Sequence, residues 1–70
     1  MLEFNRDKAI IAVGGSQFDL ALIAAMRARQ IKNGSEPKVQ TEHNAGLTAL
    51  IEIQEGLYTK KDYLEDLKKK

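Results

Sequence analysis

The sequence predicts an all-α fold, a small domain of three to four helices around a long central helix at about residues 16–32. Three observations support this prediction. The run S-Q-F-D-L-A-L-I-A-A-M-R-A-R-Q-I-K is the longest uninterrupted helical signal in the chain. A residue suited to capping a helix precedes each of four segments with apolar periodicity. No segment shows the apolar–polar alternation typical of strands.

The central helix is predicted to start at Ser16, whose hydroxyl can accept from a free N–H of the first turn. Asp19 stands three residues later, where its carboxylate can reach back in a variant of the capping box. Asn33-Gly34 provides the stop, because both residues tolerate the left-handed conformation that ends helices.

The middle of this helix is apolar nearly all the way round at about 100° per residue. One stripe of large side chains consists of Phe18, Leu22 and Met26. A second stripe of small side chains consists of Ala21, Ala24, Ala25 and Ala28. Further sides of the helix carry Leu20, Ile23 and Ile31. Such a helix must be covered from several directions, by a core or by a partner. A chain of 70 residues can hardly supply all of that cover.

Two further helices are expected on either side of the central one. The first is capped by Asn5, spans residues 6–13 and is closed by Gly14-Gly15; its expected packing residues are Ile10, Ile11 and Val13. The third is capped by Asn44 and spans residues 45–55 up to Gly56. Its broad apolar side consists of Leu47, Leu50, Ile51 and Ile53. Its narrow polar face consists of Thr48, Glu52 and Glu55.

A short last helix is predicted to open at T-K-K-D, from Thr59 to Asp62, with one apolar stripe of Tyr63, Leu64 and Leu67. This division gives a helical domain at 1–58 and a short C-terminal helix with a lysine tail at 59–70. The chain has no cysteine, no stretch of membrane-spanning length and no signal-peptide layout at its start. We therefore expect a cytoplasmic protein that does not contact a membrane.

The sequence offers few groups for chemistry. Gly14-Gly15-Ser16 could bind a phosphate at a helix start, but a tight turn between helices is favoured, because no Lys-Ser/Thr follows and no strand precedes. His43 is the sole histidine and lies in the polar connection 33–44 with no converging partners. We predict no catalytic residue, no metal site and no cofactor.

Two other classes of function compete with a protein-binding role. A small nucleic-acid-binding or transcription-regulating module would use Arg27, Arg29, Lys32 and Lys38, but Arg27 and Arg29 lie about 160° apart around the helix. The net charge of +1 also argues against a dedicated nucleic-acid binder. A small enzyme is disfavoured because no nucleophile–base pair, metal set or cofactor loop can be identified.

Two blocks of the chain resemble the omega subunit of bacterial RNA polymerase. F-D-L-A-L-I-A-A-M-R-A-R-Q (Phe18 to Gln30) has the family's aromatic–acid–Leu start and Arg-Ala-Arg-Gln close, and T-A-L-I-E-I-Q-E-G-L (Thr48 to Leu57) is similar to a second family element. With the helix before them, the blocks cover about residues 7–57. Two blocks in the right order are more specific than one.

The resemblance implies a non-catalytic subunit that clamps the C-terminal region of the largest polymerase subunit, β′, and assists its folding, assembly and stability. Little or no direct contact with nucleic acid is implied. The positions that carry the resemblance or the apolar stripe give a predicted β′-binding set: Phe18, Asp19, Leu22, Arg27, Arg29, Gln30, Ala49, Leu50, Glu52, Ile53 and Gly56.

The chain also departs from the family pattern. Ser16-Gln17 replaces the usual Asn-Arg before the aromatic residue, and Ile51 stands where the family has Arg. The N-terminus M-L-E-F-N does not match the enterobacterial sequence that helps form a guanosine tetraphosphate site, so that site is not carried over. A divergent bacterial member and a viral copy both stay open.

Overall fold

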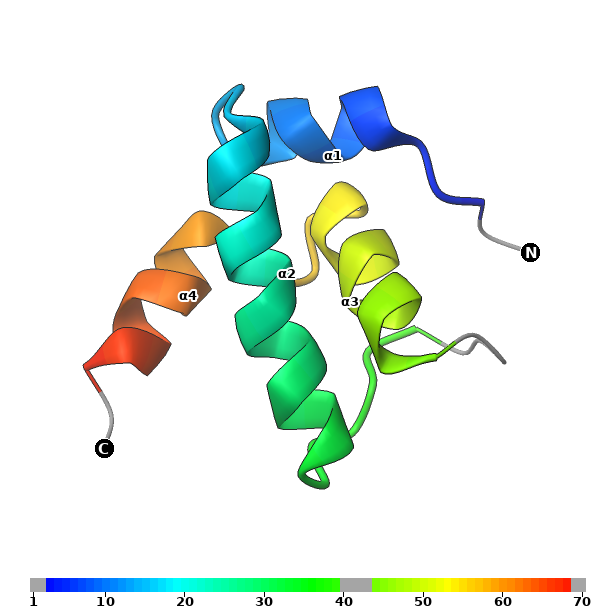
Figure 1. Ribbon diagram of the computed structural model, residues 1–70, viewed down its shortest axis with the longest axis vertical. Coiled ribbons are helices and arrows are strands. Elements are labelled where there is room, and N and C mark those ends of the chain that lie inside the picture. Colours follow the sequence, from blue (N-terminus) through cyan, green and yellow to red (C-terminus); the bar gives the residue numbers. More distant parts are fainter. Residues whose placement is uncertain (1–2, 40–43, 69–70) are drawn as a thin grey trace.

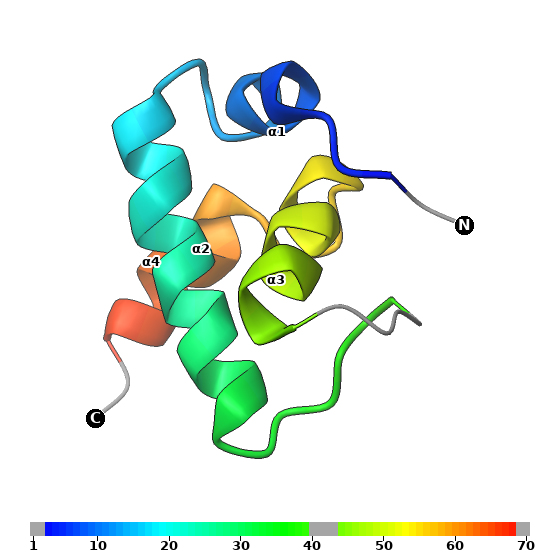
Figure 2. The same cartoon turned by 45° about the vertical axis from the view of Figure 1, so that its right-hand side comes forward.

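The computed structural model describes residues 3–39 and 44–68 and confirms the all-α prediction. Its helices are α1 (Arg6–Ala12), α2 (Gln17–Lys32), α3 (Ala45–Gln54) and α4 (Lys60–Leu67). Helix α2 runs through the middle, with α3 antiparallel along one side and α4 along the other (Figure 1). Helix α1 crosses the end of the molecule where α2 begins and α3 finishes, as the turned view also shows (Figure 2).

All four helix starts lie where the sequence predicts them. The side chains of Asn5, Ser16, Asn44 and Thr59 each accept a hydrogen bond from a backbone N–H three residues later. At α4 the Asp62 carboxylate also accepts from the Thr59 backbone N–H, which completes a capping box. At α2 the expected reach-back of Asp19 is not what the structure shows, because its carboxylate binds the Lys60 ammonium instead.

The turn between α1 and α2 depends on two glycines. Gly14 and Gly15 have φ values of 95° and 94°, in the left-handed region that side chains with a Cβ rarely adopt. The two helices meet there at a bend of 90°. Within the described part of the chain no single helix is long and apolar enough to cross a membrane; α1 and α2 reach that length and composition only when taken together across this bend.

The apolar core lies where α1, α2 and α3 meet. It consists of Ala9, Val13, Leu20, Ile23, Ala24, Ile53 and Tyr58, with Ile10, Leu50 and Tyr63 packed against it. The prediction that Ile11 packs in this core is wrong, because 75 % of that residue is exposed. On so short a helix, Ile10 and Val13 lie three positions apart and face the core together, whereas Ile11 is turned about 100° away from Ile10.

The polar face that the sequence predicts on α3 is mostly buried in the structure. Thr48 and Glu52 are buried, and only Glu55 keeps part of its surface exposed. The physical reason is that Glu52 faces an arginine of α2, so burial does not leave its charge unpaired.

A buried glutamine ties the N-terminal segment to the end of α3. Gln54 Nε2 donates to the Glu3 carbonyl at 2.6 Å, and the Asn5 backbone N–H donates to Gln54 Oε1 at 2.5 Å. This pair of bonds holds Phe4 beside α3. His43 lies outside the described residues.

Candidate partner-binding surface

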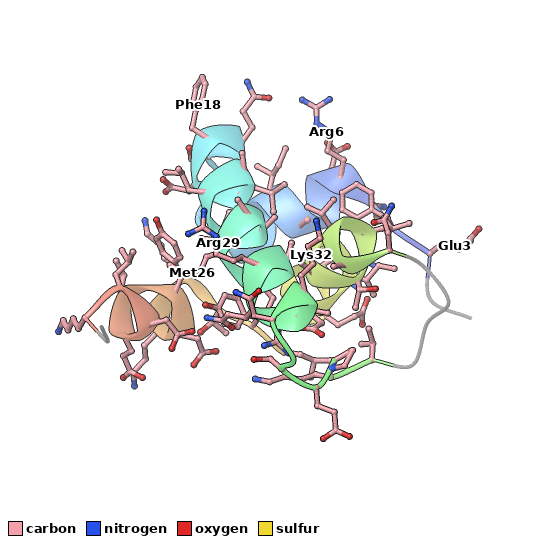
Figure 3. All side chains as sticks on the ribbon, turned by 60° about the horizontal axis from the view of Figure 1, so that its bottom comes forward. Glu3, Arg6, Phe18, Met26, Arg29 and Lys32 are labelled. Carbon is pink, nitrogen blue, oxygen red and sulfur yellow. The ribbon has the colours of Figure 1, made fainter. Side chains whose placement is uncertain are left out.

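The longest helix keeps one side uncovered. We call this side the open face of α2 and define it by six exposed residues: Phe18, Ala21, Leu22, Ala25, Arg29 and Lys32. They lie within an arc of about 100° around the helix. Phe18 is 74 % exposed and Leu22 is 58 % exposed. In Figure 3 the Phe18 ring extends away from the ribbon, with Arg29 and Lys32 further along the same helix.

The composition of the open face changes along its length. Its first half is apolar, with two large side chains beside two alanines, and its second half carries the two positive charges of Arg29 and Lys32. A contiguous exposed apolar patch next to polar residues is typical of a protein-binding site. The alanines leave room for close approach of another backbone, so the patch is suited to a packed partner.

An apolar groove continues the open face toward α3 and the N-terminal segment. It encloses about 530 Å³ and is lined by Phe4, Arg6, Gln17, Phe18, Leu20, Ala21, Ala24 and Leu50. Arg6 is the only charged residue among them, and its guanidinium donates to Gln17 Oε1 at 2.8 Å. The groove and the open face share Phe18 and Ala21 and form one continuous apolar surface.

The opposite side of α2 is closed by a buried ion pair. Arg27 Nε donates to Glu52 Oε1 at 2.5 Å, and the two side chains are 6 % and 0 % exposed. The same guanidinium donates to the Glu36 carbonyl at 3.0 Å and to Gln30 Oε1 at 3.1 Å, and its centre lies 5.5 Å from the Tyr58 ring centroid. Arg27 therefore links α2, α3 and the segment after α2.

The carboxylate of Glu52 is fully used within the domain. Besides Arg27 it accepts from the Lys38 backbone N–H at 2.8 Å. Among the described residues, no buried side-chain nitrogen or oxygen lacks a hydrogen-bond partner. Burial is therefore compensated on both sides of the pair, and the cluster is a structural centre of the fold.

Helix α4 contacts the third side of α2 through polar groups. Lys60 Nζ lies 3.0 Å from Asp19 Oδ2, and Gln30 Nε2 donates to Asp66 Oδ2 at 2.7 Å. The Tyr58 hydroxyl donates to the same Asp66 oxygen at 2.7 Å. Burial, together with this neighbouring carboxylate, raises the pKa of Tyr58 well above its ordinary value, so Tyr58 acts as a neutral donor.

The structure divides the predicted β′-binding set by exposure. Phe18, Leu22 and Arg29 lie on the open face, and Gly56 is also exposed; Asp19, Gln30 and Leu50 are partly covered; Arg27, Ala49, Glu52 and Ile53 are buried within the domain. Of the eleven, only the first three belong to the open face. A contact of any of these residues with a partner stays a prediction.

Sequence reasoning missed several residues of this surface. Phe4, Arg6 and Gln17 line the groove but carry no periodic signal, because they lie before or at the start of a helix. The stripe of four alanines is not one surface: Ala24 is buried and Ala28 half-buried, whereas Ala21 and Ala25 are exposed. Counting at about 100° per residue separates Ala24 from Ala25 and would have revealed this split.

The four cations of the nucleic-acid alternative do not form one basic face. Arg27 is buried against Glu52, and the Lys38 ammonium donates to the Leu57 carbonyl at 2.9 Å. Arg29 and Lys32 are left on the open face. Within residues 3–39 and 44–68, no three His, Cys, Asp or Glu side chains converge on a point that would hold a metal ion.

Comparisons with known proteins agree with the resemblance seen in the two blocks. The sequence model of the family RNA polymerase Rpb6 matches residues 10–59. A protein of Vibrio atlanticus (strain LGP32), the DNA-directed RNA polymerase subunit omega, is 52 % identical over 48 residues, which cover 66 % of this chain and 53 % of the relative. The chain therefore spans about half the length of the relative it matches.

The matched segment contains α2 with its whole open face, α3, and all of the groove lining except Phe4 and Arg6. The chain belongs to the RNA polymerase Rpb6 family. Within that family, its sequence is of the omega type.

Proposed function

We propose that this chain is a non-catalytic subunit of a multisubunit RNA polymerase, that it binds the C-terminal region of the β′ subunit, and that it promotes the folding, assembly and stability of β′. Family membership supports the association with the polymerase. The observation that carries the binding role is the open face of α2, where Phe18 and Leu22 remain largely exposed although a small domain has little apolar surface to spare.

The open face offers β′ a site that the domain does not need for its own folding, whereas the groove beside it borders the core through Leu20, Ala24 and Leu50. The core lies on the other side of α2, so a partner can cover Phe18 and Leu22 without disturbing Ile23 or Arg27. Burial of a leucine side chain contributes about 1.5–3 kcal/mol. Two such anchors would supply much of the affinity of an assembly subunit, because a few buried apolar residues dominate most interfaces.

Co-expression of the tagged chain with the cognate β′, followed by affinity purification, tests the proposal. We expect recovery of β′ with the native chain and about a tenfold or larger loss of affinity for Leu22→Asp, from the apolar contact that the carboxylate replaces. Leu67→Asp is the matched control, because Leu67 is 47 % exposed and is the last residue of α4, outside the open face. Both variants should melt close to the native chain, since exposed substitutions rarely change stability by more than about 0.5 kcal/mol.

Failure to recover any polymerase subunit with the native chain would refute the proposal. Equal recovery of β′ with Leu22→Asp and Leu67→Asp would agree with association with the polymerase, but it would show that the contact does not involve the open face.

A further inference from the structure

We infer that α4 is a displaceable cover over one side of α2, and that the partner bound at the open face competes with it. This inference rests on the proposed function, since it concerns the same helix and the same partner. In the free chain α4 would occupy part of the surface that the partner uses, and binding would release it.

The first support is what α4 holds. Its Lys60 ammonium binds the Asp19 carboxylate, and its Asp66 carboxylate accepts from the Gln30 amide. Asp19 and Gln30 lie on α2 about 100° and 120° around the helix from Phe18. Half-buried Met26 lies between this pair and the open face, and Figure 3 shows it on the side of α2 that faces α4. Removal of α4 would widen the open face by this strip.

The second support is how weakly α4 is attached. None of its residues is buried, and Leu64 and Leu67 are 48 % and 47 % exposed. Tyr63 is its only residue packed against the core. The Lys60–Asp19 pair has side chains that are 50 % and 36 % exposed, so solvent and salt screen it. An eight-residue helix is marginal without tertiary support, so loss of these contacts would also unwind α4.

The third support is the position of α4 in the chain. The family match ends at residue 59, which is the N-cap of α4. The surface that the family shares is therefore complete before α4 begins. Since α4 lies against that surface, it either adds to the binding site or covers it. Its Lys60 and Asp66 side chains are already paired with α2, and a partner would need to replace those two pairs to reach Asp19 and Gln30, so we favour a cover.

The experiment compares Glu65→Pro with Glu65→Ala in the full chain. Glu65 is an exposed position of α4, where proline removes a helical N–H and clashes with the preceding turn, whereas alanine keeps the helix. Neither change touches α2. Affinity is measured against core polymerase of the same organism prepared without this subunit. We expect Glu65→Pro to bind about 3–10-fold more tightly than the native chain and Glu65→Ala to bind equally, because release of a cover raises the binding-competent fraction.

Hydrogen exchange provides a readout that does not depend on a variant. Amides of α4 in the native chain should exchange faster in the complex than in the free chain. Weaker or equal binding by Glu65→Pro, or slower exchange of α4 in the complex, would overturn the inference and make α4 part of the interface or a bystander. If the native chain shows no binding at all, the proposed function fails instead.

Discussion

The two sides of α2 that face α3 and α4 are both held by polar contacts, yet these contacts differ in burial. The Arg27–Glu52 pair on the α3 side is 6 % and 0 % exposed, and the Lys60–Asp19 pair on the α4 side is 50 % and 36 % exposed. The first pair sits within a sealed cluster of hydrogen bonds, and water reaches the second. The α3 side of α2 is thus held by a sealed ion pair, and the α4 side by an ion pair that is open to solvent.

Burial decides which of these pairs matters for stability. Removal of one partner from a buried pair leaves an uncompensated charge, which costs about 3–5 kcal/mol. An exposed pair contributes about 0–1 kcal/mol. A small domain has only about 5–15 kcal/mol of stability in total, so the Arg27–Glu52 pair contributes far more to the fold than the Lys60–Asp19 pair.

The largest effect is expected from Glu52→Ala, which leaves the Arg27 guanidinium buried without its carboxylate. We expect a loss of about 3–5 kcal/mol in the free energy of unfolding, measured by urea denaturation. Glu55→Ala is the matched control, since Glu55 pairs with Lys8 at the surface of the same helix end. The control should lose no more than about 1 kcal/mol. A similar loss in both variants would remove the distinction between buried and exposed pairs.

A smaller effect is expected from leucine at two adjacent alanines of α2. Ala24→Leu places three additional carbons in the core and should cost about 1–3 kcal/mol in thermal or urea unfolding. Ala25→Leu adds the same atoms on the open face and should leave the melt unchanged, because both residues favour helix. Ala25→Leu should instead weaken binding to β′ by crowding a close contact. A stability loss at Ala25 would mean that the open face is packed within the domain.

The smallest expected effect is the loss of α4 helix stability at acid pH, which depends on the capping box of this helix. Hydrogen bonds from Thr59 to the charged carboxylate hold the pKa of Asp62 below its ordinary value of 3.8. A depressed folded-state pKa gives a stabilisation that is complete above that ordinary value and is lost as the pH falls through the lower folded-state value. Asp62→Asn should therefore lose about 0.3–1 kcal/mol of α4 helix stability near neutral pH and should remove this acid dependence. Circular dichroism between pH 7 and 2 measures both; an unchanged acid transition in Asp62→Asn would show that another carboxylate governs it.

Sequence reasoning located the helices well because their ends are set by local chemistry. Asn5, Ser16, Asn44 and Thr59 each cap a helix through a bond that spans only three residues. The resemblance in two blocks also identified the family before any tertiary contact was known.

Long-range pairing was beyond such reasoning. Arg27 and Glu52 are separated by 25 residues, and nothing in their neighbourhoods marks them as mutual partners. Without that pairing, Glu52 was assigned to the narrow polar face of its helix, and both Arg27 and Glu52 to the predicted β′-binding set. Ile11 was misplaced for a related reason, because a helix of seven residues can bury only one narrow stripe. Tyr58 follows the end of α3, and no periodicity predicts that its ring lies beneath Arg27.

The closed hydrogen-bond cluster around Arg27 has a consequence for the speed of association. Because α2 and α3 are held together by groups that are already paired, the open face is formed before the partner arrives, and capture does not require the subunit to fold. First contact at the open face should then proceed at about 10⁵–10⁷ M⁻¹s⁻¹, the range typical of docking between ordered surfaces. Differences in affinity among variants of Phe18 and Leu22 should accordingly appear as faster dissociation, while the rate of capture stays nearly constant.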